Sequence, residues 1–354
     1  MSTANTIYVY IGSYAEKDDQ GIYVYTLDRA TGKLSPVSSV AGIENPSFLT
    51  MTPDQSYVYA VSETTSEPGA VAAFAVDPQS KELTLLNQQS TGGAAPCHLI
   101  FDGTHNHLVV VNYSGGSICL YPLDKDGRIG KLADTIQHHG QSINPDRQEA
   151  AHPHSANLTP DGTHIFVPDL GQDKIFCYKI DEEAQKLVLQ GETTVKAGSG
   201  PRHFTFHPTR NYAYVINELS STITAFMYEP ATQSLYAIQT ISTLPEGYQG
   251  ESTAAEIKIH PSGKFLYGSN RGHDSIVTFA LDATSGLLTL IGHISSFGET
   301  PRNFALTPEG DFLLVANQDG NNVVTYKLDG QTGKVSTTKE IVDIAHPVCI
   351  QIMN

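Results

Sequence analysis

The 354-residue sequence contains no tryptophan, and its four cysteines lie far apart and form no C-x-x-C pair: Cys97, Cys119, Cys177 and Cys349. This spacing fits neither a disulfide framework nor a thiolate metal site, and it favours buried, reduced thiols in a cytoplasmic protein. No apolar run approaches the ~18 residues that cross a bilayer, so we expect no membrane partner. The N-terminus also lacks the basic segment and apolar core of a signal peptide.

Positive charge is scarce as well. The chain carries 37 acidic and 21 basic residues, for a formal net charge of −16. No Lys/Arg-rich run stands out, which argues against a nucleic-acid partner. The acidic excess describes a self-repelling surface. An anionic ligand would therefore need a local cluster of arginines that works against the field of the whole protein.

The chain shows no sustained helical periodicity, and instead one pattern recurs. Short runs of Val, Ile, Thr and Tyr are bounded by Gly, Pro, Asn and Asp, as is typical of β-strands and turns. The clearest copies are SFLTMTPDQSYVYAVSE (47–63), HFTFHPTRNYAYVINE (203–218), EIKIHPSGKFLYGSNR (256–271) and NFALTPEGDFLLVANQ (303–318), with weaker copies at 98–113 and 154–169. Each copy reads as an alternating strand, a turn and a more hydrophobic second strand.

These copies are 47 to 57 residues apart, and a third and a fourth strand follow each one. Four strands in about fifty residues form the blade of a β-propeller. The segment IYVYIGSY (7–14) matches a second strand, and HPVCIQIMN (346–354) matches a first strand. The sequence therefore predicts an all-β, seven-bladed β-propeller spanning 1–354 as one domain. Each blade has four antiparallel strands, and the terminal strands share the blade that closes the ring and removes its exposed edges.

Chemically capable side chains occupy equivalent positions in several blades. The start of each first strand and the end of each second strand meet at the same mouth of the propeller, because neighbouring strands run antiparallel. His154, Arg202, Glu218 and Arg271 stand in these positions and combine an imidazole, a carboxylate and two fixed cations. We expect them to form a functional site. We also expect substrate contacts from the same positions and from the long loop at 138–155: Arg147, Gln148, His203, Glu256, Arg302 and Asn317.

Two patterns bear on metal binding. An asparagine recurs at the ends of second strands, at Asn112, Asn217, Asn270 and Asn317. Such residues commonly cap turns, and the alternative is a ring of amide oxygens around a Ca²⁺ ion, helped by Asp169 and glutamates such as Glu63. His152 and His154 lack a third ligand at zinc-like spacing. We therefore expect no metal and no cofactor, with the asparagine ring as the alternative.

Five stretches carry a family resemblance: AHPHSANLTPDG (151–162), GPRHFTFHP (200–208), YVINE (214–218), AEIKIHPSGKFLYGSNRGHDSI (255–276) and PRNFALTPEGDFLLVANQ (301–318). Over essentially the whole chain, the sequence resembles the seven-bladed lactonase family. This family includes bacterial propeller-type 6-phosphogluconolactonases and fungal carboxy-cis,cis-muconate lactonizing enzymes. The His, Arg, Glu and Arg proposed as the active site of the muconate-lactonizing members fall on His154, Arg202, Glu218 and Arg271.

The resemblance implies hydrolysis of a small anionic sugar lactone, most simply 6-phosphogluconolactone. The implied chemistry is metal-independent: arginines bind the anionic group, and either His154 or Glu218 activates water while the other protonates the leaving oxygen. Ser155 and Ser269 lack a G-x-S-x-G context, so no covalent nucleophile is expected. Two alternatives remain, a lactonizing or isomerising enzyme acting on another organic acid, and a non-catalytic propeller that binds a ligand or protein. The sequence leaves the oligomeric state open.

Overall fold

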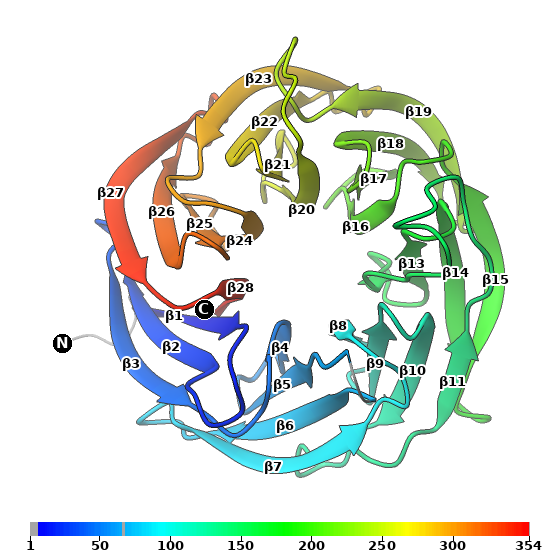
Figure 1. The fold of residues 1–354 in the computed structure, drawn as a ribbon, viewed down its shortest axis with the longest axis vertical. Helices are drawn as coiled ribbons and strands as arrows, with labels where there is room; N and C mark the ends of the chain where they lie inside the picture. Colours follow the sequence, from blue (N-terminus) through cyan, green and yellow to red (C-terminus); the bar gives the residue numbers. More distant parts are fainter. Residues whose placement is uncertain (1–5, 66–67, 354) are drawn as a thin grey trace.

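The computed structural model describes residues 6–65 and 68–353, and the strands in these residues form seven sheets arranged as blades around a central axis (Figure 1). Listed from the innermost strand outward, the first four blades are β28 (Pro347–Met353), β1 (Thr6–Ser13), β2 (Ile22–Asp28) and β3 (Leu34–Val40); β4 (Leu49–Met51), β5 (Tyr57–Ser62), β6 (Ala70–Val76) and β7 (Leu83–Ser90); β8 (Pro96–Phe101), β9 (His107–Asn112), β10 (Ser117–Pro122) and β11 (Asp134–Gln137); and β12 (Asn157–Leu158), β13 (Ile165–Asp169), β14 (Lys174–Asp181) and β15 (Lys186–Thr194). The other three are β16 (Pro201–Phe206), β17 (Tyr212–Asn217), β18 (Thr222–Glu229) and β19 (Ser234–Ser242); β20 (Thr253–Ile259), β21 (Phe265–Arg271), β22 (Ser275–Leu281) and β23 (Leu288–Ser295); and β24 (Pro301–Leu306), β25 (Phe312–Asn317), β26 (Asn322–Leu328) and β27 (Val335–Asp343).

The predicted seven blades of four antiparallel strands are therefore confirmed. Residues 1–5, 66, 67 and 354 of the predicted span lie outside the described residues. Within the described ranges, no helix has the length and apolar character needed to cross a membrane.

The first and last strands of the chain lie in the same blade, as predicted. The innermost strand β28 pairs antiparallel with β1, with Tyr10 opposite Gln351 and Ile11 opposite Ile350. Figure 1 shows β28 beside the central axis, next to β1, with β2 and β3 farther out. The ring is thus held closed by backbone hydrogen bonds between the two ends of the chain.

Hydrophobicity decides where each strand sits in its blade. The second strand β25 reads FLLVAN and is buried throughout, whereas the outermost strand β27 alternates between exposed and partly buried residues. Neighbouring blades are joined by recurring tyrosines: the hydroxyls of Tyr59 and Tyr214 each donate to a turn carbonyl of the next blade, at Gly127 and Gly286, over 2.9 Å. A buried tyrosine needs such an acceptor, which fixes the spacing of adjacent blades.

The turns between third and fourth strands share one aspartate-based design. Asp28 Oδ1 accepts the backbone N–H groups of Ala30 and Thr31, and aspartates at the same position repeat the pattern in other blades. This side-chain turn explains the TGKL-like segments of the sequence. The hydrogen bonds to Thr31 and Ala30 also hold the pKa of Asp28 below its ordinary value.

Irregular pairing at the start of several inner strands positions the site. On β16 the paired residues are Pro201 and His203, whereas their partners on β17 are consecutive, so Arg202 is an extra, unpaired residue. β24 has the same extra residue at Arg302. A bulge of this kind redirects side chains that would otherwise alternate between two faces. Arg202 and its neighbour His203 consequently line the same small cavity near the axis.

Candidate active site

A cavity of about 280 Å³ lies at the mouth where the second strands end. Of the ten predicted site residues, it is lined by Arg147, His154, Glu218, Arg271 and Arg302. Arg202 and His203 line a much smaller space, of about 10 Å³, which shares His154 and Arg302 with this cavity. The convergence expected from the repeat thus occurs for seven of the ten residues.

A larger cavity, of about 560 Å³, lies on the opposite side of a layer of rings. This layer contains Phe48, His98 and His203, with 4.0 Å between the first two ring centres and 5.4 Å between the last two. Lys258 is the strong cation in the lining of this cavity. Size alone therefore does not identify the site, since the arginines gather in the smaller cavity.

Glu218 is the electrostatic centre of the 280 Å³ cavity. Its Oε2 atom lies 2.9 Å from Arg202 Nε and 2.8 Å from Arg271 Nη2, and Arg147 Nη2 donates to its Oε1. Arg202 stands at the start of β16 and Arg271 at the end of β21, while Arg147 reaches in from the loop between β11 and β12. One carboxylate thus joins three guanidinium groups from separate segments.

This arrangement fixes the charge of Glu218, whose side chain is only 4% exposed. Burial alone would raise its pKa, but the charges of Arg271, Arg202 and Arg147 outweigh burial and hold that pKa well below its usual range. Burial lowers the pKa of Arg202 to about 10, which leaves it charged at neutral pH. Glu218 is therefore a permanent anion, poorly suited to exchange a proton near neutrality.

Arg302 contrasts with the other three arginines. Across the residues that the structure describes, its guanidinium makes no hydrogen bond or ion pair with the protein, and it lies over the ring of Tyr14 at 5.5 Å from the ring centre. The Tyr14 hydroxyl donates to Glu63, 3.2 Å from Oε2, and Ser47 Oγ also donates to this atom. Arg302 therefore presents unused N–H donors to the cavity.

Tyr14 and Glu63 were missing from the predicted site. Glu63 occupies the same position after its second strand as Glu218. YVYIGSY (8–14) aligns with YVYAVSE (57–63), so Tyr14 occupies the equivalent position in its own blade. The repeat contained the information needed to find Tyr14. It required examining the position after the second strand in the blade shared by the two termini as well.

His154 is buried against Cys97, with Nδ1 3.9 Å from the sulfur. Burial, reinforced by the positive charge of Arg202, holds the pKa of His154 well below its ordinary value. Burial likewise raises the pKa of the Cys97 thiol, whose S–H donates to the His154 carbonyl oxygen over 3.4 Å. At neutral pH the site therefore contains a neutral imidazole beside a protonated thiol.

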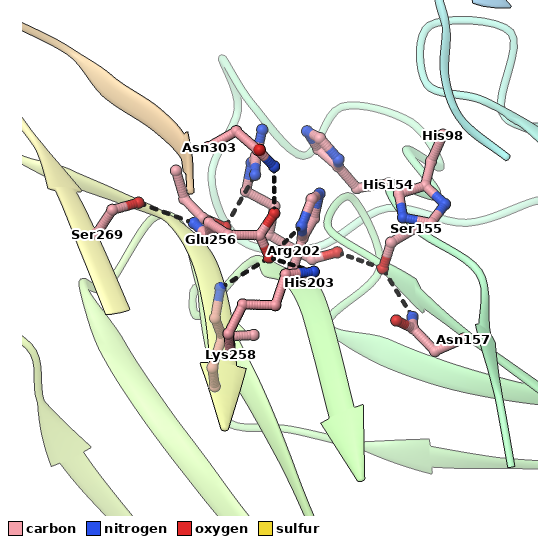
Figure 2. A network of polar contacts seen from close by, with 12 residues as sticks. His98, His154, Ser155, Asn157, Arg202, His203, Glu256, Lys258, Ser269 and Asn303 are labelled. Carbon is pink, nitrogen blue, oxygen red and sulfur yellow. Dashed lines mark hydrogen bonds and ion pairs between the residues drawn. The ribbon is translucent and has the colours of Figure 1, made fainter. Parts of the chain in front are cut away.

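Beneath the cavity, His203 forms a buried pair with Glu256. His203 Nδ1 lies 3.0 Å from Glu256 Oε1, and Asn303 Nδ2 donates to Oε2 of the same carboxylate. Figure 2 shows Glu256 between these two residues and Lys258, which approaches from the other side, 3.5 Å from Oε1. Glu256 is thus reached through His203 and does not line the substrate-sized cavity.

Two predicted substrate contacts are used elsewhere. Gln148 is fully buried, and its Nε2 donates to the Leu170 carbonyl while its Oε1 accepts from the backbone of Asn144. Asn317 is also buried, and its Nδ2 donates to the Ser296 carbonyl and to Asn322 Oδ1. Both amides brace the backbone, and neither reaches the cavity.

The other recurring asparagines make comparable contacts. Asn217 Nδ2 donates to two threonine hydroxyls on β18, and Asn270 Nδ2 donates to the Thr243 carbonyl. These Nδ2 bonds brace the strand ends. Asn270 Oδ1 accepts the Thr243 hydroxyl, whereas the buried Oδ1 atoms of Asn112, Asn217 and Asn317 have no hydrogen-bond partner among the described residues. Among the described residues, no group of three His, Cys, Asp or Glu side chains is arranged to hold a metal ion.

The cavity is therefore positively charged inside an acidic protein. Its walls and the adjoining small space carry four guanidinium groups, from Arg147, Arg202, Arg271 and Arg302, against the carboxylates of Glu63 and Glu218. Such an excess attracts an anion and stabilises negative charge that develops during a reaction.

Comparisons with known proteins agree with the fold. Residues 8–352 match the model of the family described as "Lactonase, 7-bladed beta-propeller". A 6-phosphogluconolactonase of Bacillus subtilis (strain 168) is 32% identical over 98% of both chains, and one from Formosa agariphila is 38% identical over 84% of this chain and 86% of its own. The structure of the periplasmic gluconolactonase PpgL of Pseudomonas aeruginosa superposes with a TM-score of 0.93, at 33% identity and over 99% of both chains.

Proposed function

Because this chain belongs to the seven-bladed β-propeller lactonase family, we propose that it is a lactonase that hydrolyses 6-phosphogluconolactone to 6-phosphogluconate. One observation carries this proposal: a cavity with an excess of guanidinium groups contains an arginine, Arg302, whose N–H donors are not used by any residue that the structure describes. Two relatives that match most of the chain are named 6-phosphogluconolactonase, which supports the same substrate.

The phosphate binds near the outer part of the cavity, at Arg147 and Arg271. The Arg147 side chain is 40% exposed and spends part of its donor set on Glu218 and Tyr113, which leaves further N–H groups for a ligand. A guanidinium matches phosphate oxygens better than an ammonium does, because it donates two parallel hydrogen bonds. Glu218 holds both arginines in place and keeps them from repelling each other.

The lactone carbonyl lies deeper, beside Arg302 and His154. As water attacks the carbonyl carbon, negative charge develops on the oxygen, and the free donors of Arg302 stabilise it together with a neutral His154 N–H. Glu218 takes no part in proton transfer, which revises the role expected from the sequence, because its pKa is held far from neutrality. The proton acceptor is then another group at the base of the cavity.

The arginines supply the positive charge for these steps, so we propose chemistry that uses no metal ion. We also assign the enzyme to the cytoplasm, where phosphorylated sugars occur and where four buried, unpaired cysteines remain reduced.

The test measures hydrolysis of 6-phosphogluconolactone and unphosphorylated glucono-δ-lactone, each corrected for its spontaneous rate. We expect the phosphorylated lactone to have the higher kcat/KM, and Arg147→Met to lower that preference about tenfold or more while leaving glucono-δ-lactone nearly unchanged. Arg210→Met, at an exposed site outside the cavity, serves as the matched control, and EDTA treatment should leave the rate unchanged.

A preference for glucono-δ-lactone would instead assign the substrate class of the Pseudomonas relative. Absence of acceleration with either lactone would overturn the proposal and favour lactone formation, isomerisation or ligand binding. A rate that EDTA abolishes and added metal restores would overturn metal independence alone.

A further inference from the structure

We propose that His203, oriented by Glu256, is the general base that activates the hydrolytic water, and that this water occupies a one-molecule compartment beneath the substrate cavity. The inference rests on the proposed lactone hydrolysis and deepens it by assigning the proton acceptor. It adds a catalytic residue and a binding site for the second substrate, water.

The surroundings of Glu256 determine which nitrogen of His203 carries the proton. Glu256 is 1% exposed, and it accepts the backbone N–H of Ile257 over 2.9 Å and an amide N–H of Asn303 over 2.5 Å. These donors favour its ionised form, which can only accept hydrogen bonds. His203 Nδ1, 3.0 Å away, must then carry the hydrogen, and Nε2 keeps its lone pair.

That lone pair has no partner among residues 6–65 and 68–353. His203 Nε2 is buried and makes no hydrogen bond within the described part of the chain. A buried acceptor left in this state is unfavourable, and a bound water would satisfy it. In Figure 2 Glu256 and Lys258 lie on one side of the His203 ring and His154 lies on the other.

The small space next to His203 has the size of one water molecule. Its volume is about 10 Å³, and its lining includes His203, Arg202, Asn303 and Glu63. A cavity needs about 10–15 Å³ and two to four polar partners to hold a water. Four residues line both this space and the 280 Å³ cavity: Glu63, Cys97, His154 and Arg302. A water bound here therefore adjoins a lactone carbonyl held by Arg302.

The other candidate bases are less well arranged. Within the described ranges, the polar contact of His154 Nδ1 is the Cys97 sulfur at 3.9 Å, and no carboxylate there fixes the tautomer of this imidazole. Glu63 already accepts the hydroxyls of Tyr14 and Ser47. His203 combines a fixed tautomer, an unused lone pair and a place beside the water-sized space.

The chemical step balances with these groups alone. The water oxygen forms a bond to the lactone carbonyl carbon, and one water proton passes to His203 Nε2. The ring C–O bond then breaks, and the same proton passes from the imidazolium to the departing ring oxygen. His203 ends neutral, and the new carboxylic acid loses its proton to solvent.

Burial, together with the cations that face His203, keeps it neutral at pH 7 against the attraction of Glu256. The groups that face it are Arg202 on its own strand, Glu256 and Lys258 on β20, and the imidazoles of His98 and His154. Burial outweighs the attraction of Glu256 and lowers the pKa of His203 to about 4. The acid limb of kcat/KM should therefore lie near pH 4 and not near 6.5.

The experiment compares wild type with His203→Gln, Glu256→Gln and a matched control, His207→Gln. His207 is also buried and directly follows the same strand, β16. It lines the 560 Å³ cavity instead, and its Nε2 atom is hydrogen-bonded to the Gly263 carbonyl over 3.0 Å. We expect His203→Gln to lower kcat about 10²–10⁴-fold with KM within a few-fold. Glu256→Gln should lower kcat less and move the acid limb, and the control should keep its rate.

A second measurement reads the tautomer without turnover. The ¹⁵N resonances of His203 in the wild-type protein should show a protonated Nδ1 and an unprotonated Nε2 at pH 7. The reverse tautomer would overturn the proposal, as would a His203→Gln variant with wild-type kcat or one that changes KM alone. A wild type that hydrolyses neither lactone would instead overturn the proposed function, and the assignment of a base with it.

Discussion

The guanidinium of Arg302 lies 5.5 Å from the centre of the Tyr14 ring, so a cation from the β24 blade rests on an aromatic face from the blade that joins the chain ends. A cation–π contact holds a guanidinium without consuming its N–H groups. The Tyr14 hydroxyl is in turn bonded to Glu63. Arg302 is thereby positioned without any of its donors being used by the described part of the chain, which leaves them to bind substrate.

Replacing Arg302 should therefore impair catalysis more than folding. We expect Arg302→Met to lower kcat about 10²–10³-fold, because it removes donors that bind the charge developing on the carbonyl oxygen. Arg302→Lys should recover only part of the rate, since an ammonium lacks the planar donor fork. Steady-state kinetics and the thermal midpoint should be measured together. A parallel loss of stability and rate would contradict a role confined to the reaction.

Glu218→Gln should destabilise the protein. Removing one partner of a buried ion pair costs about 3–5 kcal/mol, and here three arginines would lose their shared counter-charge. Urea unfolding should reveal the loss, and inorganic phosphate should restore more stability to this variant than to wild type. Glu309→Gln, at an exposed pair with Arg29, should cost under about 1 kcal/mol. Equal effects of the two substitutions would refute the assigned role.

The free energy of unfolding should decrease in two stages as the pH is lowered. Burial, the largest cause, holds the pKa values of His98, His154 and His203 below 6.5, so below that pH the unfolded chain binds more protons than the folded one. Each such histidine contributes a loss of up to about 1.4 kcal/mol per pH unit. Below about pH 4.5 the depressed pKa values of Glu218 and Glu256 add a second loss, because these carboxylates are stabilised only when ionised.

Urea unfolding at intervals between pH 7.5 and 4 checks both stages. His98→Gln, which removes one buried imidazole from the layer between the cavities, should have a shallower slope between pH 6.5 and 5 than wild type. An unchanged slope would show that the buried histidines do not account for the first stage.

Cys97 lines the cavity but should not act as a nucleophile. Burial raises its pKa, so the reactive thiolate is absent at neutral pH. We expect Cys97→Ala to retain activity within a few-fold and iodoacetamide to leave wild type active. Rapid inactivation that substrate prevents would indicate an exposed thiolate and reverse this expectation.

The fold and much of the site could be predicted from the sequence, because each blade of a propeller repeats the same geometry. Once the blades were aligned, the position of Arg202 at a strand start and Glu218 at a strand end predicted that they would meet. The repeat could not predict how a side chain is used. Gln148 and Asn317 occupy suitable positions but spend their amides on nearby backbone and side-chain groups. The proton affinity of Glu218 was equally hidden, since it depends on three guanidinium groups that come together only in space.

The pairing of β28 with β1 has a consequence for protein synthesis. Strands β1, β2 and β3 leave the ribosome first, but the inner edge of their blade stays unpaired until residues 347–353 emerge. The other six blades consist of consecutive strands and can form in order during translation. Tyr14 follows β1 and reaches its place beneath Arg302 only when the ring closes. A nascent chain should therefore complete its catalytic arrangement only when β28 pairs with β1.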